Sequence, residues 1–367
     1  MKNILVVGNG YDIAHGLKTS YKDFIEFVLE SKWESCSVDS LVEDSKGIER
    51  EFIKLVTDNP FMKYFKSYYR NISTWVDFES ELRKITKAIY KYLRSIPEEC
   101  NGQIPKSASY EPKPYVKKIL EYFSYLQQLN FGTTYEDNLL LEPRIYNEVY
   151  GVNWDIVNDD MKKSLDDLKR ALVIYLKYYM PCVSNTIDKN KQIEKIKPDL
   201  IISFNYTNTY QLYGFQKSQV LHVHGELESE NIVLGYEDDE ADKELFLLGF
   251  RKFFQRIENQ LPMINKGLFA WNDQWGTHYS CMVHLYGMSL DKTDEDMIKT
   301  IFEGCRKFIV YYLDNGTDYP NKIKNLISVL GKKIFLDAYY DEKIVFIKIE
   351  KELYRVIPIK KGFPREK

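Results

Sequence analysis

The chain has 367 residues, 44% of them hydrophobic, so it can bury a large core and form about two domains. Its 51 basic and 54 acidic side chains give a formal net charge of -3, which excludes the basic footprint of a dedicated DNA-binding protein and does not indicate direct nucleic-acid binding. The five cysteines are scattered, and no apolar run approaches the roughly 20 residues that span a bilayer. We therefore expect a cytoplasmic protein without a disulfide framework, a cysteine zinc site or a membrane partner.

The first predicted element is a short strand at residues 3–7, which stops at the turn GNGYD, residues 8–12. Ser20 and Asp23 then form a capping-box pattern, which predicts the start of a helix. From there to about residue 195, apolar residues recur three and four positions apart, as they do in helices. The clearest helical patterns lie at 49–56, 78–96, 116–129 and 161–180.

After residue 195 the pattern changes to short apolar runs typical of strands. These runs lie at 199–207, 219–225, 231–236, 281–287, 307–314, 332–339 and 342–349. Helical patterns separate several of them, at 243–261, 294–304 and 320–331. Strands rich in Ile, Val and Leu that alternate with helices indicate a parallel sheet covered on both faces. We therefore predict an α/β fold with a Rossmann-like, mainly parallel sheet in a discontinuous domain (1–19 and 196–367), and a helical insertion (20–195) after the first strand.

Polar turns follow four of the predicted strands. They run from Gly8 to Asp12, from Asn205 to Thr207, from His224 to Gly225 and from Gly287 to Leu290. In a doubly wound sheet the ligand lies beyond the carboxyl ends of the strands, so these turns are expected to share one crevice. The first turn is not the dinucleotide fingerprint G-x-G-x-x-G, and the chain has no G-x-x-x-x-G-K-[ST] loop. Both observations disfavour a dehydrogenase and a Walker-type NTPase.

Several blocks together resemble the AbiH-type bacteriophage abortive-infection family. In the order of that family, they are GNGYD (8–12), GLKTSYKDF (16–24), WVDFE (75–79), FNYT (204–207), HVHG (222–225) and GMSLDKTDED (287–296). More distantly, GNGYD, NYT, HG and GMSL are similar to the turns G-A-G-x-S, N-Y-D, H-G and G-T-S-L of the sirtuin-like fold of NAD hydrolases. The resemblance implies a sirtuin-like nucleotide-binding domain that takes NAD as substrate or ligand and needs no metal.

The resemblance also implies three catalytic residues, Asn205, His224 and Asp12. Asn205 is expected to hold the ribose hydroxyls or the attacking water, and His224 is expected to act as general base. Asp12 is expected to supply the carboxylate that is missing because Thr207 stands where N-Y-D has its aspartate.

A second set of residues is implied to contact the nucleotide: Gly8, Asn9, Gly10, Thr207, Gly287 and Ser289. Gly8 and Gly10 are expected to turn their backbone N–H groups toward the diphosphate, and Ser289 to bind the second ribose or a phosphate. The function implied is an abortive-infection effector that hydrolyses NAD+ to ADP-ribose and nicotinamide. Its partners are expected to be NAD or a related nucleotide and either a second copy of the chain or another defence protein.

The residues leave alternatives open. Gly8 and Gly10 can instead form only a tight strand-to-helix turn, and block 75–79 can either pack a helix or bring a carboxylate over the crevice. A protein lacking the N-Y-D aspartate can bind the nucleotide as a sensor without turning it over. His222 and His224, two apart on a strand, form an H-x-H pair, which with Asp12 or His284 would suit a metal-dependent hydrolase.

Overall fold

We analysed a computed structural model of the chain. It describes residues 2–39, 42–68, 75–97, 102, 104, 110–127, 140–147, 151–184, 186–237, 245–273, 276–279, 281–350 and 354–358. Within these ranges no helix combines the length and the hydrophobicity that crossing a membrane requires.

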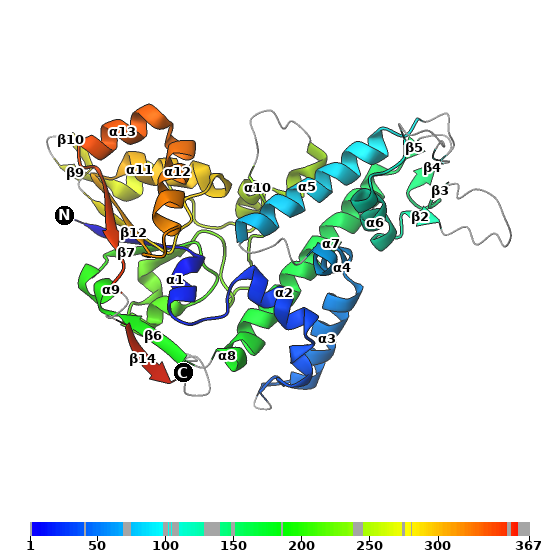
Figure 1. The fold of residues 1–367 in the computed structure, drawn as a ribbon, viewed down its shortest axis with the longest axis horizontal. Coiled ribbons are helices and arrows are strands. Elements are labelled where there is room, and N and C mark those ends of the chain that lie inside the picture. The colour runs from blue at the N-terminus through cyan, green and yellow to red at the C-terminus, as the bar shows by residue number, and fades with distance from the viewer. Residues whose placement is uncertain are drawn as a thin grey trace.

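A six-stranded parallel sheet forms the core of one half of the molecule (Figure 1). Its order is β13-β12-β11-β1-β7-β8, and every neighbouring pair runs parallel. The strands are β1 (Asn3–Val7), β7 (Leu200–Ser203), β8 (Val220–His222), β11 (Met282–Tyr286), β12 (Lys307–Tyr312) and β13 (Ile344–Lys348). Numbered along the chain, this order is 6-5-4-1-2-3, the order of doubly wound α/β sheets. The predicted α/β fold with a parallel sheet is confirmed.

Helices cover the sheet on both faces because its strands are apolar on both sides. Ile4 and Val6 of β1 belong to one buried cluster, and Leu5 and Val7 belong to another. The first face is covered by α11 (Glu295–Gly304), α12 (Asp318–Leu330) and α13 (Lys332–Tyr340). The second is covered by α1 (Asn9–Ala14), α9 (Lys191–Ile196) and the 3-10 helix η5 (Thr209–Tyr213).

The helical region after β1 forms the other half of the molecule, and its long helices extend away from the sheet (Figure 1). The helices are α2 (Tyr21–Leu29), α3 (Ser45–Asp58), α4 (Pro60–Tyr68), α5 (Trp75–Arg94), α6 (Pro114–Tyr122), α7 (Trp154–Ile174), the π-helix η4 (Tyr175–Tyr179) and α8 (Met180–Val183). The Ser20 and Asp23 capping box that opens α2 is present as predicted.

Six further helical elements and several short strands complete the described part of the chain. The helical elements are α10 (Lys252–Glu258) and the 3-10 helices η1 (Lys32–Glu34), η6 (Lys217–Gln219), η7 (Leu245–Phe250), η8 (Lys266–Phe269) and η9 (Lys292–Asp294). The short strands pair as β2 (Leu126–Gln127) with β3 (Leu140–Leu141), β4 (Tyr146–Asn147) with β5 (Gly151–Val152), β6 (Thr186–Asn190) with β14 (Tyr354–Pro358), and β9 (Ala270–Asp273) with β10 (Gly276–Tyr279).

The core of the helical region includes residues from later in the chain. Tyr206, Leu234, Tyr236 and Phe250 are buried in the same apolar cluster as the helices that precede α9. The helical region therefore packs against the segment that crosses between β8 and β11. The predicted division of the chain at residues 19 and 196 stays a prediction.

Two predicted strands were wrong. Residues 332–339 form helix α13, in which Phe335 and Ala338, three apart, are both buried. Its apolar run also fits a helix, and a short run does not separate the two possibilities. Residues 231–236 form an extended segment with a single bridge between Tyr236 and Arg251. The polar groups of this segment bond partly to side chains, since Gln255 pairs with both backbone groups of Leu234.

Candidate active site

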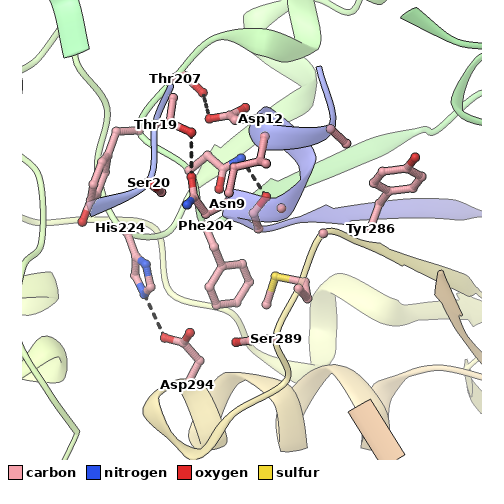
Figure 2. A pocket seen from close by; sticks show the side chains of 18 of the residues that line it. Asn9, Asp12, Thr19, Ser20, Phe204, Thr207, His224, Tyr286, Ser289 and Asp294 are labelled. Carbon is pink, nitrogen blue, oxygen red and sulfur yellow. Dashed lines mark hydrogen bonds and ion pairs between the residues drawn. The ribbon is translucent and has the colours of Figure 1, made fainter. Parts of the chain in front are cut away.

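One cavity of about 300 Å³ lies at the carboxyl ends of the central strands (Figure 2). It opens where β1 and β11 lie side by side, the point at which the chain connections turn to opposite sides of the sheet and where such sheets bind ligands. Every site residue expected from the sequence lines it: Gly8, Asn9, Gly10, Asp12, Asn205, Thr207, His224, Gly287 and Ser289. The four polar turns therefore meet in one pocket, as predicted.

The glycines of the first turn are required by the chain that passes beside them. A Cβ atom on Gly10 would lie 2.8 Å from the Gly287 backbone, and one on Gly287 would lie 1.9 Å from Tyr11 N. The N–H of Gly8 donates to Tyr286 O at 3.1 Å, and the N–H of Gly10 donates to Gly287 O at 2.9 Å. The expectation that these two N–H groups face a diphosphate was therefore wrong, because both already bond to the chain leaving β11.

Asn205 holds the first turn in place. Its Nδ2 donates to Gly8 O at 3.0 Å, and its own backbone oxygen accepts from His222 Nδ1 at 3.1 Å. Only 6% of Asn205 is exposed. The side chain thus positions the turn between β1 and α1 within the pocket wall.

Asp12 is a buried carboxylate with one oxygen that makes no hydrogen bond. Its Oδ2 accepts from Thr207 Oγ1 at 2.5 Å, whereas its Oδ1 has no partner within the described part of the chain. Burial raises the pKa of Asp12 to about 6, although the hydrogen bond from Thr207 and the neighbouring polar side chains of Thr209 and Asn205 favour the ionised form. An unsatisfied buried carboxylate oxygen is costly, and such sites commonly serve a ligand or a reaction.

Asn9 and Ser289 occupy different depths of the pocket. Asn9 Oδ1 accepts from Thr19 Oγ1 at 2.8 Å, which ties α1 to the chain that enters the helical region. Ser289 is exposed at the rim, and its backbone oxygen accepts from Asn325 Nδ2 at 2.8 Å. Its hydroxyl can therefore meet a ligand only at the mouth of the pocket.

His224 lies opposite Asp12, beside a carboxylate that the sequence did not single out. Its Nε2 is 3.2 Å from Asp294 Oδ1, and its ring packs edge-on against Phe204 with the ring centroids 5.1 Å apart (Figure 2). Burial lowers the pKa of His224, and the charge of Asp294 only partly opposes this effect. The imidazole is therefore neutral at neutral pH and can accept a proton.

A buried lysine joins this pair to the helical region. Lys252 Nζ lies 2.9 Å from Glu79 Oε1 and 3.1 Å from Asp294 Oδ1, and Lys252 is 2% exposed. Burial alone would lower the pKa of Lys252, but the two carboxylates outweigh it and raise the pKa. Burial raises the pKa of Asp294, yet Lys252 and His224 hold it well below its usual value. For Glu79 burial prevails, and its pKa rises to about 7.

Of these residues, Lys252 was missed by sequence reasoning, and Asp294 was quoted only within the block 287–296. Glu79 was considered with Trp75 and Asp77, either as a residue that caps and packs a helix or as a carboxylate over the crevice. The alternative in which block 75–79 brings a carboxylate to the crevice fits the position of Glu79, while the side chains of Trp75 and Asp77 lie outside the described ones. One signal was available in the sequence: Glu79 stands seven residues before Thr86, a spacing that places both side chains on the same side of a helix. In α5 both side chains are buried.

The H-x-H pair does not converge on one site. β8 ends at His222, and only His224 lines the cavity, while the His222 ring packs against Tyr210 with the centroids 5.8 Å apart. His284 bonds elsewhere, to Tyr311 OH at 3.2 Å. Within the described ranges, no three His, Cys, Asp or Glu side chains are arranged to hold a metal ion.

The fold and the pocket together define an α/β protein with a ligand site at the switch point of a doubly wound sheet. Residues 4–312 match the family described as bacteriophage abortive infection AbiH, and the chain belongs to this family. It is thus an abortive-infection protein that acts against phage. Comparisons with curated proteins and with solved structures gave no match.

Proposed function

We propose that this protein is an NAD+ hydrolase that breaks the bond between nicotinamide and ribose. Water adds to the ribose C1′, nicotinamide leaves with the bonding electrons, and the products are ADP-ribose, nicotinamide and one proton. Loss of NAD+ would stop the metabolism of an infected cell, which fits the abortive-infection family.

The observation that carries the proposal is the pairing of two different acid–base groups across one pocket. His224 is buried, neutral and held by Asp294, and Asp12 is a buried carboxylate with an unpartnered oxygen. Hydrolysis of an N-glycoside needs a base for the water and negative charge beside a cation-like ribose. With the ring proton on Nε2, which lies 3.2 Å from Asp294 Oδ1, Nδ1 of His224 is left to accept the proton.

The contact between Asp12 and Thr207 supports the distant sirtuin-like resemblance. Thr207 stands where those proteins have a carboxylate, and its hydroxyl donates to Asp12 Oδ2. Asp12, in helix α1 after the neighbouring strand β1, thereby brings a carboxylate next to Thr207. In this proposal Asp12 orders the ribose hydroxyls, and Asn205 positions the turn that carries Asp12.

The test is release of nicotinamide from NAD+ by the purified full chain, with and without lysate of phage-infected cells. We expect His224→Gln and Asp12→Asn each to lower kcat by about 10² to 10⁴. The matched control is His284→Gln, a buried histidine of β11 that bonds to Tyr311 and does not itself line the cavity. Equal loss in His284→Gln would show that the effect comes from folding and not from the site.

The same assay separates the remaining alternatives. Binding of NAD+ that raises the melting temperature, with no nicotinamide released under any condition, would favour a sensor. Activity that requires an added divalent metal would favour a metal-dependent hydrolase instead. Size-exclusion chromatography before and after adding lysate would show whether a second copy or another protein joins the chain.

A further inference from the structure

The charge of the pocket is unsuited to a diphosphate. Among the described lining residues, the carboxylates are Asp12, Glu79, Asp294 and Asp318, and the ammonium groups are Lys252 and Lys322. Four negative charges against two positive ones leave an excess of two negative charges when all are ionised. A dianionic diphosphate would be repelled by this excess, whereas a cation would be attracted.

The donors that usually bind phosphate are already engaged. Lys252 is held by two carboxylates, and Lys322 Nζ lies 2.7 Å from Asp318 Oδ1. The N–H groups of Gly8 and Gly10 bond to the chain leaving β11. Asp12 lies in the first turn of α1, where a negative charge cancels the attraction of a helix N-terminus for an anion.

The centre of the pocket instead suits a flat cation. The Phe204 ring lies beside His224, near Ser289 in the view of Figure 2, and Tyr206, Tyr286 and Tyr311 also contribute to the lining. Aromatic faces and nearby carboxylates both attract a delocalised positive charge. The unpartnered Asp12 Oδ1, on a residue only 1% exposed, gives this cation or its ribose a buried acceptor.

We propose that the pocket recognises the cationic pyridinium–ribose half of its substrate and obtains little affinity from the diphosphate and adenosine. The cavity volume of about 300 Å³ lies at the lower end of the range for small-molecule sites, as expected for one half of a dinucleotide. This inference rests on the proposed function for the choice of nicotinamide as the pyridinium. It extends the substrate class to N-ribosyl pyridinium compounds in general, including those without an adenylate.

The first test is equilibrium binding of four compounds to the full chain: NAD+, nicotinamide riboside, its uncharged reduced form, and ADP-ribose. We expect NAD+ and nicotinamide riboside to bind within about tenfold of each other, and the uncharged riboside and ADP-ribose to bind at least about tenfold more weakly. The uncharged riboside is the matched ligand, because it differs mainly in the charge and pucker of one ring.

A pair of variants sharpens the test. Asp12→Asn is expected to weaken nicotinamide riboside at least about tenfold more than its uncharged form, because the two forms share the ribose and differ in the charge of the ring. The control is Asp314→Asn, which removes an exposed carboxylate that pairs with Lys348 outside the pocket. ADP-ribose that binds as tightly as NAD+, or a failure of nicotinamide riboside to bind, would overturn the inference.

Nicotinamide release from NAD+, nicotinamide mononucleotide and nicotinamide riboside then separates this inference from the proposed function. Similar kcat/KM for all three compounds supports both the hydrolase function and the inference. The expected binding pattern without release from any compound leaves the pyridinium site in place and refutes the hydrolase. Release from NAD+ alone supports the hydrolase and refutes the inference.

Discussion

The pocket has two walls of different construction. The sheet wall consists of the strand-end residues Gly8–Asp12, Asn205–Thr207 and Gly287–Ser289, held by backbone hydrogen bonds and close glycine contacts. The ion wall consists of Glu79, Lys252 and Asp294, three charges that come from α5, α10 and η9; Glu79 and Lys252 are buried and Asp294 is half-buried. His224 lies between the walls and contacts the ion wall through Asp294.

This difference shows that one pocket can combine a closely packed backbone wall with a wall of paired charges. The sheet wall depends on the absence of side chains, because a single added Cβ collides with neighbouring backbone. The ion wall depends on complete pairing, because each of its charges has given up water and needs its partners. The helical region contributes Glu79, so the two halves of the molecule meet at the candidate base.

The largest effect is expected from breaking the ion wall. Lys252→Met should lower the free energy of unfolding by about 3–5 kcal/mol, because it leaves the buried Glu79 and the half-buried Asp294 without their cation. Denaturant unfolding measures this change in the free energy of unfolding. The control is Lys217→Met, an exposed lysine paired with Glu226 and Glu228, for which we expect a loss of less than about 1 kcal/mol. Equal losses would mean that the three charges of the ion wall do not act as a unit.

The sheet wall is tested at its tightest contact. Gly287→Ala places a Cβ 1.9 Å from Tyr11 N, at a positive φ of 69°. Gly214→Ala is the matched control, since Gly214 has a φ of 76° and no atom lies within 4 Å of its Cβ position. We expect about 1 kcal/mol of backbone strain in both variants and about 2 kcal/mol more in Gly287→Ala. Similar stabilities would show that the turn relaxes easily.

Asp12→Asn should stabilise the protein, with a magnitude that depends on pH. The pKa of Asp12 rises from 3.8 to about 6 on folding, so between these values the folded state holds the proton more tightly. The free energy of unfolding of the wild type therefore falls as pH rises from about 4 to 6. Above pH 6 Asp12 is ionised in the folded state, and the loss of stability is complete. We expect Asp12→Asn to be more stable by about 2 kcal/mol at pH 7.5 and nearly unchanged at pH 4. Destabilisation at both pH values would contradict the assignment.

The smallest effect concerns the junction of the two walls. Asp294 raises the pKa of His224 against the larger effect of burial. Asp294→Asn should therefore lower the pH at which His224 titrates, as followed by NMR of its ring. His284 serves as an internal control, because burial lowers its pKa to about 4 and Asp294 is not among the causes. An unchanged His224 titration would refute the coupling.

Much of the sheet followed from local patterns, and the site residues that the family resemblance implied all line the pocket, although their roles stay predictions. The strand at β1 was identified by its continuous apolar run, and the turn residues were identified by their place at strand ends. The α13 helix and the segment 231–236 were misassigned, because short apolar runs fit either period and tertiary contacts decide between them. The role of Gly8 and Gly10 was also misread, since a strand-end glycine looks the same whether a ligand or another strand approaches it.

The sequence by itself determined the parallel sheet, the helical block after β1 and the polar turns that meet at one rim. It could do so because side-chain period is a local property, the alternation of apolar strands with helices indicates parallel pairing, and a parallel sheet brings its carboxyl ends together. Only the tertiary structure decided which glycine faces which backbone and which charges become buried. Lys252, Glu79 and Asp294 lie on three separate elements, and each alone resembles an ordinary solvated charge. Their contact arises from the packing of the helical region on the sheet, which no local pattern records.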